Sequence, residues 1–314
     1  GNLMFSIIPA NSAAAAPAAT QKAIFAYGDS TAGDNFVSLK NLVNSSGVIA
    51  ADVTGVGTAR GALGAAGYGG DKAIFAYGNS GSVTSLSNLV SNEGVVASDE
   101  TGVGTARSYP GSANYGGDKA IFAYGYDGSS KTAVSNKVSN SGVVASDTAG
   151  VGIVRNGSTA VSYGEDKAIF AYGSNAAGDM ISTKNLVSNE GVIASDTSGA
   201  GTARYQMAAA SYGGDKAIYA FGYIQSSGTR VNTKNLVSNE GVIASDASGV
   251  GTARRLLAAA GYGEDKAVFA YGQISGSLSS LKNLVSNSGV VASDVTGVGT
   301  ARLGLAAAGY STTA

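Results

Sequence analysis

Apolar and polar positions repeat in the same order six times along this chain of 314 residues. Each copy opens with Lys-Ala-aliphatic-aromatic-Ala-aromatic-Gly, which is rich in residues that favour β-strands and has no helical apolar period. A partly alternating segment such as SLKNLVSN (280–287) follows, and then a Gly turn with GVVAS (289–293). The copies begin at Lys22, Lys72, Lys119, Lys167, Lys216 and Lys266. The pattern predicts repeated short strands and no helix of useful length.

Four short antiparallel strands are expected in each unit. The first is the small, apolar segment after the closing Arg, such as 303–310. Tyr-Gly-Gly-Asp or Tyr-Gly-Glu-Asp then turns the chain into the aromatic second strand, because Gly supplies the positive φ of a tight hairpin. The Asn-Leu-Val and Gly-Val-Val-Ala-Ser segments are predicted as strands three and four. The closing Asp-x-Thr-Gly-Val-Gly-Thr-Ala-Arg stretch has too much Gly for a helix, and we expect an extended crossing to the next unit.

Almost every spacing within the units is constant. The closing Arg precedes the next Lys by 12 residues, the Asn of the third strand precedes an Asp by 11, and that Asp precedes the Arg by 8. Between the Gly that ends the second strand and the Asn, the separation varies from 10 to 13 residues. One loop in each unit therefore takes all insertions, and these variable loops are rich in Ser, Gly, Asn and Tyr.

Composition excludes several classes of function. Hydrophobic residues make up 44% of the chain, so it can build a core, although only 13% is charged. There is no Cys and no His, which removes thiol, imidazole and Cys/His metal chemistry. With 20 basic and 21 acidic residues and no basic run, nucleic acid is not an expected partner. Apolar runs are far shorter than a membrane span of about 20 residues, so we expect no membrane insertion. No cofactor is expected either.

The order of Arg, small apolar strand, hairpin, aromatic strand ending in Gly, two outer strands and next Arg resembles the kelch-type β-propeller family over about residues 22–310. The resemblance implies an all-β, six-bladed β-propeller of four-stranded antiparallel blades at 22–314. Residues 1–21 would form an N-terminal arm or linker.

Two segments compete to complete the unit that begins at Lys22. Residues 303–310 form a spare first strand, whereas Ala13–Ala16 occupies the same place before Lys22. A ring needs one of these segments, and an open solenoid would use both. Closure by the C-terminal segment is favoured, because the N-terminal one lacks the Arg and Tyr and carries Pro17, which cannot donate within a sheet.

In a four-stranded meander, the variable loops and the closing Arg residues share one face. The resemblance implies that such arginines line the central mouth and bind acidic ligands, for which guanidinium groups are suited. The candidate ligand-binding residues are Arg60, Arg107, Arg155, Arg204, Arg254, Arg302, Tyr126 and Tyr223. Identical repetition favours a structural alternative, in which each Arg pairs with the Asp eight residues earlier or with the Asp before the Lys.

Catalytic and metal sites are not expected. Glu93, Glu190 and Glu240 recur in an Asn-Glu-Gly turn, and glycoside hydrolysis needs two carboxylates in different environments, which symmetric turns do not offer. Each turn also supplies a single carboxylate, whereas a strong calcium site assembles several oxygens.

The expected function is therefore a non-enzymatic structural and binding module. Regular repeats of this kind are similar to those of structural proteins in tailed-bacteriophage virions, such as fibres or decorations. This implies an extracellular or virion location, attachment to the host through the loop face, and other assembly subunits, including copies of the same chain, as partners. The alternative is a secreted or cell-surface lectin with a glycan ligand, and an enzyme ranks third.

Overall fold

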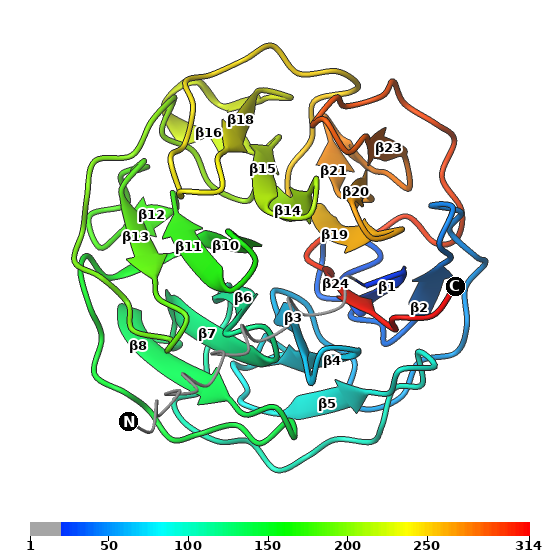
Figure 1. The fold of residues 1–314 in the computed structure, drawn as a ribbon, viewed down its shortest axis with the longest axis horizontal. Coiled ribbons are helices and arrows are strands. Elements are labelled where there is room, and N and C mark those ends of the chain that lie inside the picture. Colours follow the sequence, from blue (N-terminus) through cyan, green and yellow to red (C-terminus); the bar gives the residue numbers. More distant parts are fainter. Residues whose placement is uncertain (1–19) are drawn as a thin grey trace, which may run out of the picture.

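The computed structural model describes residues 20–314, and within them the protein is built of small antiparallel β-sheets. Six three-stranded sheets lie around a common centre (Figure 1). Their inner strands are β3 (Gly64–Tyr68), β6 (Gly111–Tyr115), β10 (Thr159–Tyr163), β14 (Ala208–Tyr212), β19 (Ala258–Tyr262) and β24 (Ala306–Tyr310). Their middle strands are β4 (Lys72–Ala76), β7 (Lys119–Tyr126), β11 (Lys167–Ala171), β15 (Lys216–Ala220), β20 (Lys266–Ala270) and β1 (Lys22–Ala26).

The outer strands come from the predicted third segment. They are β5 (Ser87–Val90), β8 (Lys131–Val138), β13 (Lys184–Val187), β18 (Lys234–Val237), β23 (Lys282–Val285) and β2 (Lys40–Val43). Short paired segments at the loops complete the described structure: β9 (Arg155–Asn156), β12 (Ser174–Asn175), β16 (Tyr223–Ile224), β17 (Thr229–Arg230), β21 (Gln273–Ile274), β22 (Ser277–Leu278) and the 3-10 turn η1 (Gln225–Ser227).

The core lies between adjacent sheets, because the middle strands are apolar on both faces. Ile24 and Phe25 of β1 are both fully buried, and they point to opposite sides of their sheet. The Phe25 ring lies 5.5 Å from Tyr271 of one neighbouring sheet, and Tyr27 lies 5.4 Å from Phe75 of the other. Each middle strand thus joins three successive sheets.

Small residues allow the inner strands to approach one another. They contact each other in the cyclic order β3, β6, β10, β14, β19, β24 and back to β3. Ala and Gly at most of these positions leave room where six strands converge. The predicted hairpin to the middle strand is confirmed: Tyr68 pairs with Lys72, and Gly69 and Gly70 both have positive φ.

The first sheet combines strands from opposite ends of the described chain. β24 pairs antiparallel with β1, so the C-terminal segment takes the place beside residues 22–26. Gln21 adds a backbone hydrogen bond to Ser311 at 2.8 Å. The competing segment Ala13–Ala16 and all but Thr20 and Gln21 of the predicted arm 1–21 lie outside the described residues.

The predicted fourth strand is wrong as a regular strand. The Gly-Val-Ile-Ala segment of the first unit makes two isolated bridges, Val43 with Ile49 and Lys40 with Val53. Between the bridges this segment has one residue more than β2, which is the irregularity of a β-bulge. The Asn41 side chain enters there and donates to the Ala50 carbonyl at 3.1 Å, so it takes the place of a backbone ladder bond.

The middle strands end in a turn that directs the chain toward the loop face. Tyr27 has φ 65° and Gly28 has φ 111°, a conformation that is uncommon for an aromatic residue. A Cβ on Gly28 would lie 2.8 Å from the Leu303 carbonyl oxygen, so only Gly fits there. The same turn recurs in all six sheets, and it directs the chain into the variable loop.

Candidate functional site

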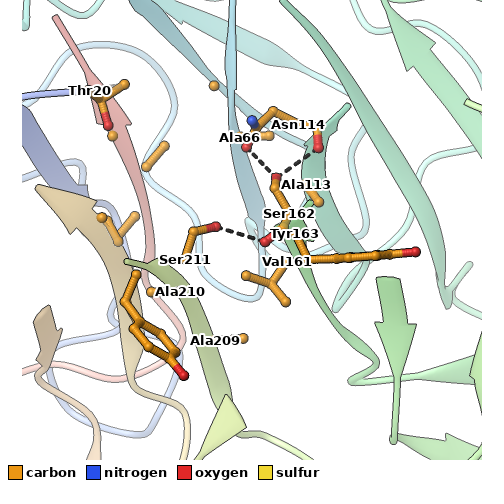
Figure 2. A pocket seen from close by; sticks show the side chains of 18 of the residues that line it. Thr20, Ala66, Ala113, Asn114, Val161, Ser162, Tyr163, Ala209, Ala210 and Ser211 are labelled. Atoms are coloured by element: carbon orange, nitrogen blue, oxygen red, sulfur yellow. Dashed lines mark hydrogen bonds between the residues drawn. The ribbon is translucent and has the colours of Figure 1, made fainter. Parts of the chain in front are cut away.

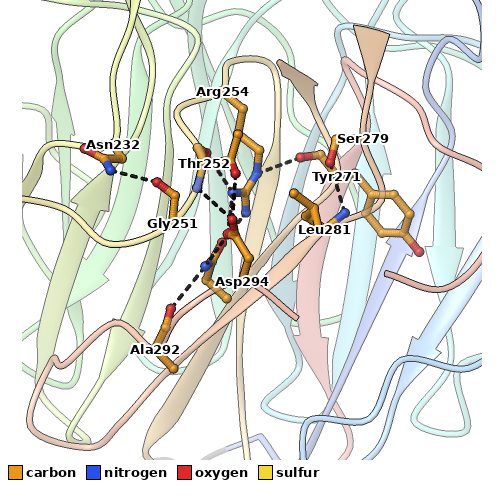
Figure 3. Close-up of polar contacts among 10 residues, drawn as sticks. Asn232, Gly251, Thr252, Arg254, Tyr271, Ser279, Leu281, Ala292 and Asp294 are labelled. Atoms are coloured by element: carbon orange, nitrogen blue, oxygen red, sulfur yellow. Dashed lines mark hydrogen bonds and ion pairs between the residues drawn. The ribbon is translucent and has the colours of Figure 1, made fainter. Parts of the chain in front are cut away.

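The six closing arginines lie between adjacent sheets. We call them, together with the recurrent Asn and Asp that lie beside them, the frame. All six have 0% exposure. In Arg254, Nε donates to the Tyr271 carbonyl at 2.9 Å, Nη1 to the Thr252 carbonyl at 3.2 Å and Nη2 to Asn283 Oδ1 at 2.6 Å (Figure 3). Its guanidinium carbon lies 4.3 Å from the centroid of the Phe221 ring of the preceding sheet. The donors therefore point into the protein.

Each arginine lies near the Asp of the following unit. Arg254 Nη1 is 3.9 Å from Asp294, whose carboxylate also accepts from the Thr252 backbone N–H at 2.9 Å and hydroxyl at 2.6 Å. Both predicted Asp partners are wrong, because the crossing carries the Arg onto the next sheet and away from the Asp eight residues earlier. The Asp before each Lys instead pairs with that Lys, as Asp265 does with Lys266 at 2.9 Å.

Hydrogen bonds lower the pKa of five of these carboxylates. Burial alone raises the pKa of Asp294, but the bonds from Thr252 and Asn283 and the positive charge of Arg254 lower it overall. The same balance lowers the pKa of Asp52, Asp99, Asp147 and Asp246.

Ligand binding by the six arginines stays a prediction, and their complete burial favours a structural role with other partners than the two predicted Asp residues. A residue whose donors are used by carbonyl and amide oxygens of its own protein has few left for a ligand. The departures from repetition lie on the loop face instead.

Those departures gather at one place in each sheet. The residue after the closing Arg bridges to the residue after the aromatic-Gly turn of the same sheet. We call these residues the variable pairs, and no two are alike: Leu303–Asp29, Gly61–Asn79, Ser108–Tyr126, Asn156–Ser174, Tyr205–Tyr223 and Arg255–Gln273. The predicted residues Tyr126 and Tyr223 belong to them. Asp29, Asn79, Ser174 and Gln273 lie in the predicted variable loops. The residues after the closing Arg were missed, although the sequence carries the signal, since this residue differs in all six units.

A ring of turns holds the variable pairs around the centre. The next residue in each unit has a positive φ of 53° to 62°: Ala62, Tyr109, Gly157, Gln206, Leu256 and Gly304. Backbone N–H groups donate from Tyr109 to Ala62 and from Ala62 to Gly304, both at 2.7 Å, and onward from Gly304 to Leu256 at 2.9 Å. Six side-chain pairs of different chemistry thus occupy equivalent backbone positions around one centre.

Two variable pairs form a basic and aromatic cluster with a loop residue. Arg255 Nε and Arg230 Nη2 both donate to Gln273 Oε1, at 2.9 and 3.0 Å. The Arg255 guanidinium carbon lies 4.6 Å from the centroid of the Tyr223 ring, and that ring lies 5.9 Å from the Tyr205 ring. All five side chains are partly exposed. We call these residues the Arg–Tyr cluster.

The inner strands surround a cavity of about 680 Å³. Figure 2 shows its polar side: Ser162 donates to Asn114 Oδ1 at 2.6 Å, and Ser211 donates to the Ser162 carbonyl at 2.9 Å. These bonds join neighbouring inner strands, so the hydroxyls hold the sheets together.

The repeated glutamates lie in exposed turns. The backbone N–H of Glu93, Glu190 and Glu240 each donates to a Ser hydroxyl two residues earlier, at 3.2 to 3.3 Å. Across residues 20–314, no three acidic side chains lie close enough together to hold a metal ion. No helix in that same stretch is long and apolar enough to cross a membrane.

No family model matches the chain, and no curated protein matches it significantly.

Proposed function

We propose that the six sheets are the blades of a kelch-like, six-bladed β-propeller that β24 closes, with the bulged segment as the fourth strand of each blade. The cyclic contacts of the inner strands and the β24–β1 pairing support this architecture. In this fold the variable pairs lie around the mouth of the central axis.

The protein acts, under this proposal, as a non-enzymatic binding module that presents the variable pairs for attachment. The proposal rests on the contrast between the constant frame residues and the variable pairs. The same Arg, Asn and Asp recur in every unit, whereas the residues beside the Arg differ in all six sheets although their backbone setting is the same. Folding requires no such variety at these positions, but recognition of an asymmetric ligand does.

The outer edge of the sheets supports a place in an assembly, which we propose to be a virion fibre or decoration. One Val in each bulged segment is 55% to 65% exposed: Val48, Val95, Val143, Val192, Val242 and Val290. Regularly placed apolar side chains suit contacts with neighbouring subunits. A secreted or cell-surface lectin is the second candidate, which the partly exposed aromatic rings of Tyr205 and Tyr223 favour.

Binding on a glycan array tests the attachment role. The wild-type protein is compared with a face variant, Tyr126→Ala with Tyr223→Ala, and with an edge control, Val95→Ser with Val192→Ser. We expect the face variant to lose binding and the edge control to keep it. Equal binding by all three proteins, or turnover of an array sugar, would contradict the proposal. Electron microscopy of purified particles distinguishes the virion subunit from the lectin. A disc present on the particle in stoichiometric amounts supports a virion subunit, whereas a free, glycan-binding protein supports the lectin.

A further inference from the structure

We propose that the Arg–Tyr cluster is a binding site for a sugar residue that carries a carboxylate. This inference rests on the proposed attachment role of the loop face and names the ligand class for one part of it. The site consists of Tyr205, Tyr223, Arg230, Arg255 and Gln273, which come from two adjacent sheets and the loop after β16.

The first argument is uncompensated positive charge. Within residues 20–314, neither Arg230 nor Arg255 forms an ion pair, and both donate to the same neutral oxygen, Gln273 Oε1. By contrast, the frame residue Arg254, directly before Arg255 in the chain, has the Asp294 carboxylate within 3.9 Å. Two guanidinium groups that share one amide oxygen attract an anion, and their forked donors match a carboxylate.

The second argument is that some guanidinium N–H donors of Arg255 and Arg230 have no hydrogen-bond partner in the described part of the chain. In the described part of the chain, no hydrogen bond uses Nη1 or Nη2 of Arg255. The Arg230 Nε is buried, and it too has no hydrogen-bond partner among residues 20–314. The burial of Nε shows that the Arg230 guanidinium is partly desolvated, and a partly desolvated guanidinium binds an anion more strongly than an exposed one.

The third argument is the aromatic surface beside the charge. Tyr223 packs against the Arg255 guanidinium at 4.6 Å, which restricts the orientation of the fork. Tyr205 lies at 56° to Tyr223, and it packs against Gly157, where a Cβ would come within 3.2 Å of its ring. The partly exposed tyrosine rings offer an apolar face and a hydroxyl side by side, which suits the C–H face and hydroxyls of a sugar ring.

The loop after β16 supplies further polar groups. Its residues 225–229 are exposed and comprise Gln225, Ser226, Ser227, Gly228 and Thr229. Amide and hydroxyl side chains of this kind make adaptable hydrogen bonds. Since no other variable pair contains an Arg, we expect one such site in each chain.

Titration calorimetry with matched sugars tests the proposal on the full-length protein. The acidic probes are 3′-sialyllactose and a galacturonic acid trisaccharide, and the neutral probes are lactose and a galactose trisaccharide. We expect at least one acidic probe to bind at about one site per chain, and its neutral counterpart to bind at least about 10-fold more weakly, as for loss of a charged hydrogen-bond partner. Sodium sulfate and sodium acetate are titrated in the same way, to detect a site that binds any small anion.

Three variants locate the binding. Arg255→Ala and Arg230→Ala are expected to lower the affinity for the acidic probe by about 10-fold or more. Arg255→Lys should retain part of the affinity, because Lys keeps the charge but lacks the paired donors of the guanidinium group. Lys266→Ala, at the first residue of β20, is the control for charge and should bind as the wild type does. Melting temperatures exclude a folding defect.

Several outcomes would overturn the site. These are equal affinity for acidic and neutral probes, binding of acetate or sulfate as tight as that of the acidic sugar, binding unchanged by the Arg substitutions, or no binding of any acidic sugar. If array binding depends on the face variant while the acidic probes do not bind, the attachment role stands and only the ligand class fails. If the face variant itself has no effect, the attachment role fails as well.

Discussion

Five of the six crossings between sheets have a Thr whose hydroxyl donates to the frame Asp, and the remaining crossing has an Ile. At Thr202, for example, the side chain donates to Asp246 at 2.6 Å and the backbone N–H donates at 3.0 Å. Ile153 occupies the same position in the third crossing, and only its backbone N–H bonds to Asp196, at 2.9 Å. The adjacent Arg155 has Nε and Nη1 without hydrogen-bond partners in the described chain. This junction is therefore the least well satisfied of the frame.

Ile153→Thr is expected to raise the free energy of unfolding by about 1 kcal/mol, since it restores one hydrogen bond to a carboxylate. Urea unfolding at neutral pH measures the change. The reverse substitution in an intact junction, Thr252→Ile, is the matched control and should lower the free energy by a similar amount. A destabilised Ile153→Thr would show that the third junction gains more from the apolar side chain than from the bond.

The frame carboxylates predict loss of stability in acid. The pKa of Asp99 lies below its ordinary value of 3.8 in the folded protein, and the same holds for Asp52, Asp147, Asp246 and Asp294. A lowered folded-state pKa contributes stability that is present above 3.8 and is lost as the pH falls through the folded value. Calorimetric melting temperatures should therefore fall steeply below about pH 4. Asp99→Asn should reduce that slope, and a melting temperature that is constant down to about pH 3 would contradict the assignment.

At the scale of the elements, two neighbouring arginines have opposite roles. Arg254→Met leaves the Tyr271 carbonyl and Asn283 Oδ1 buried without their donor. Each such group costs about 1–3 kcal/mol, so we expect a loss of at least about 2 kcal/mol of folding free energy. Arg255→Met, one residue later and partly exposed, should change it by less than about 0.5 kcal/mol. Denaturant unfolding of both variants makes the comparison, and equal losses would contradict the division into frame and face.

The elements also show where sequence reasoning succeeded and where it stopped. The inner, middle and outer strands and the hairpins were predictable, because β-formers, Gly turns and constant spacings recur in every unit. The fourth strand was not, because the Asn41 side chain takes over a backbone hydrogen bond, which no propensity records. The Asp partners of the arginines depend on a crossing between sheets, so spacing within a unit could not identify them. The Arg–Tyr cluster brings together Tyr205, Arg230 and Arg255 from two neighbouring units, although the variable residue after each closing Arg was visible.

For the whole molecule, stability depends on the strand that completes the first sheet. Deletion of 303–314 removes Leu305 and Tyr310, which are buried in two different inter-sheet cores. Each large buried apolar side chain contributes about 1.5–3 kcal/mol, and the deletion also leaves β1 without its inner neighbour, so we expect a loss of more than about 4 kcal/mol. Calorimetry should show a lower and broader transition, whereas deletion of 312–314 should leave the melting temperature nearly unchanged.

The pairing of β24 with β1 also sets the order in which the molecule can be completed during translation. Residues 22–43 are synthesised before the five other sheets, and their inner neighbour β24 is synthesised only after them. Until then the early strands expose an edge that accepts any strand of matching sequence, and the repeats provide several. A nascent chain can therefore borrow this strand from another copy, and crowded synthesis favours exchanged dimers, which unfolding and refolding at low protein concentration would convert into monomers.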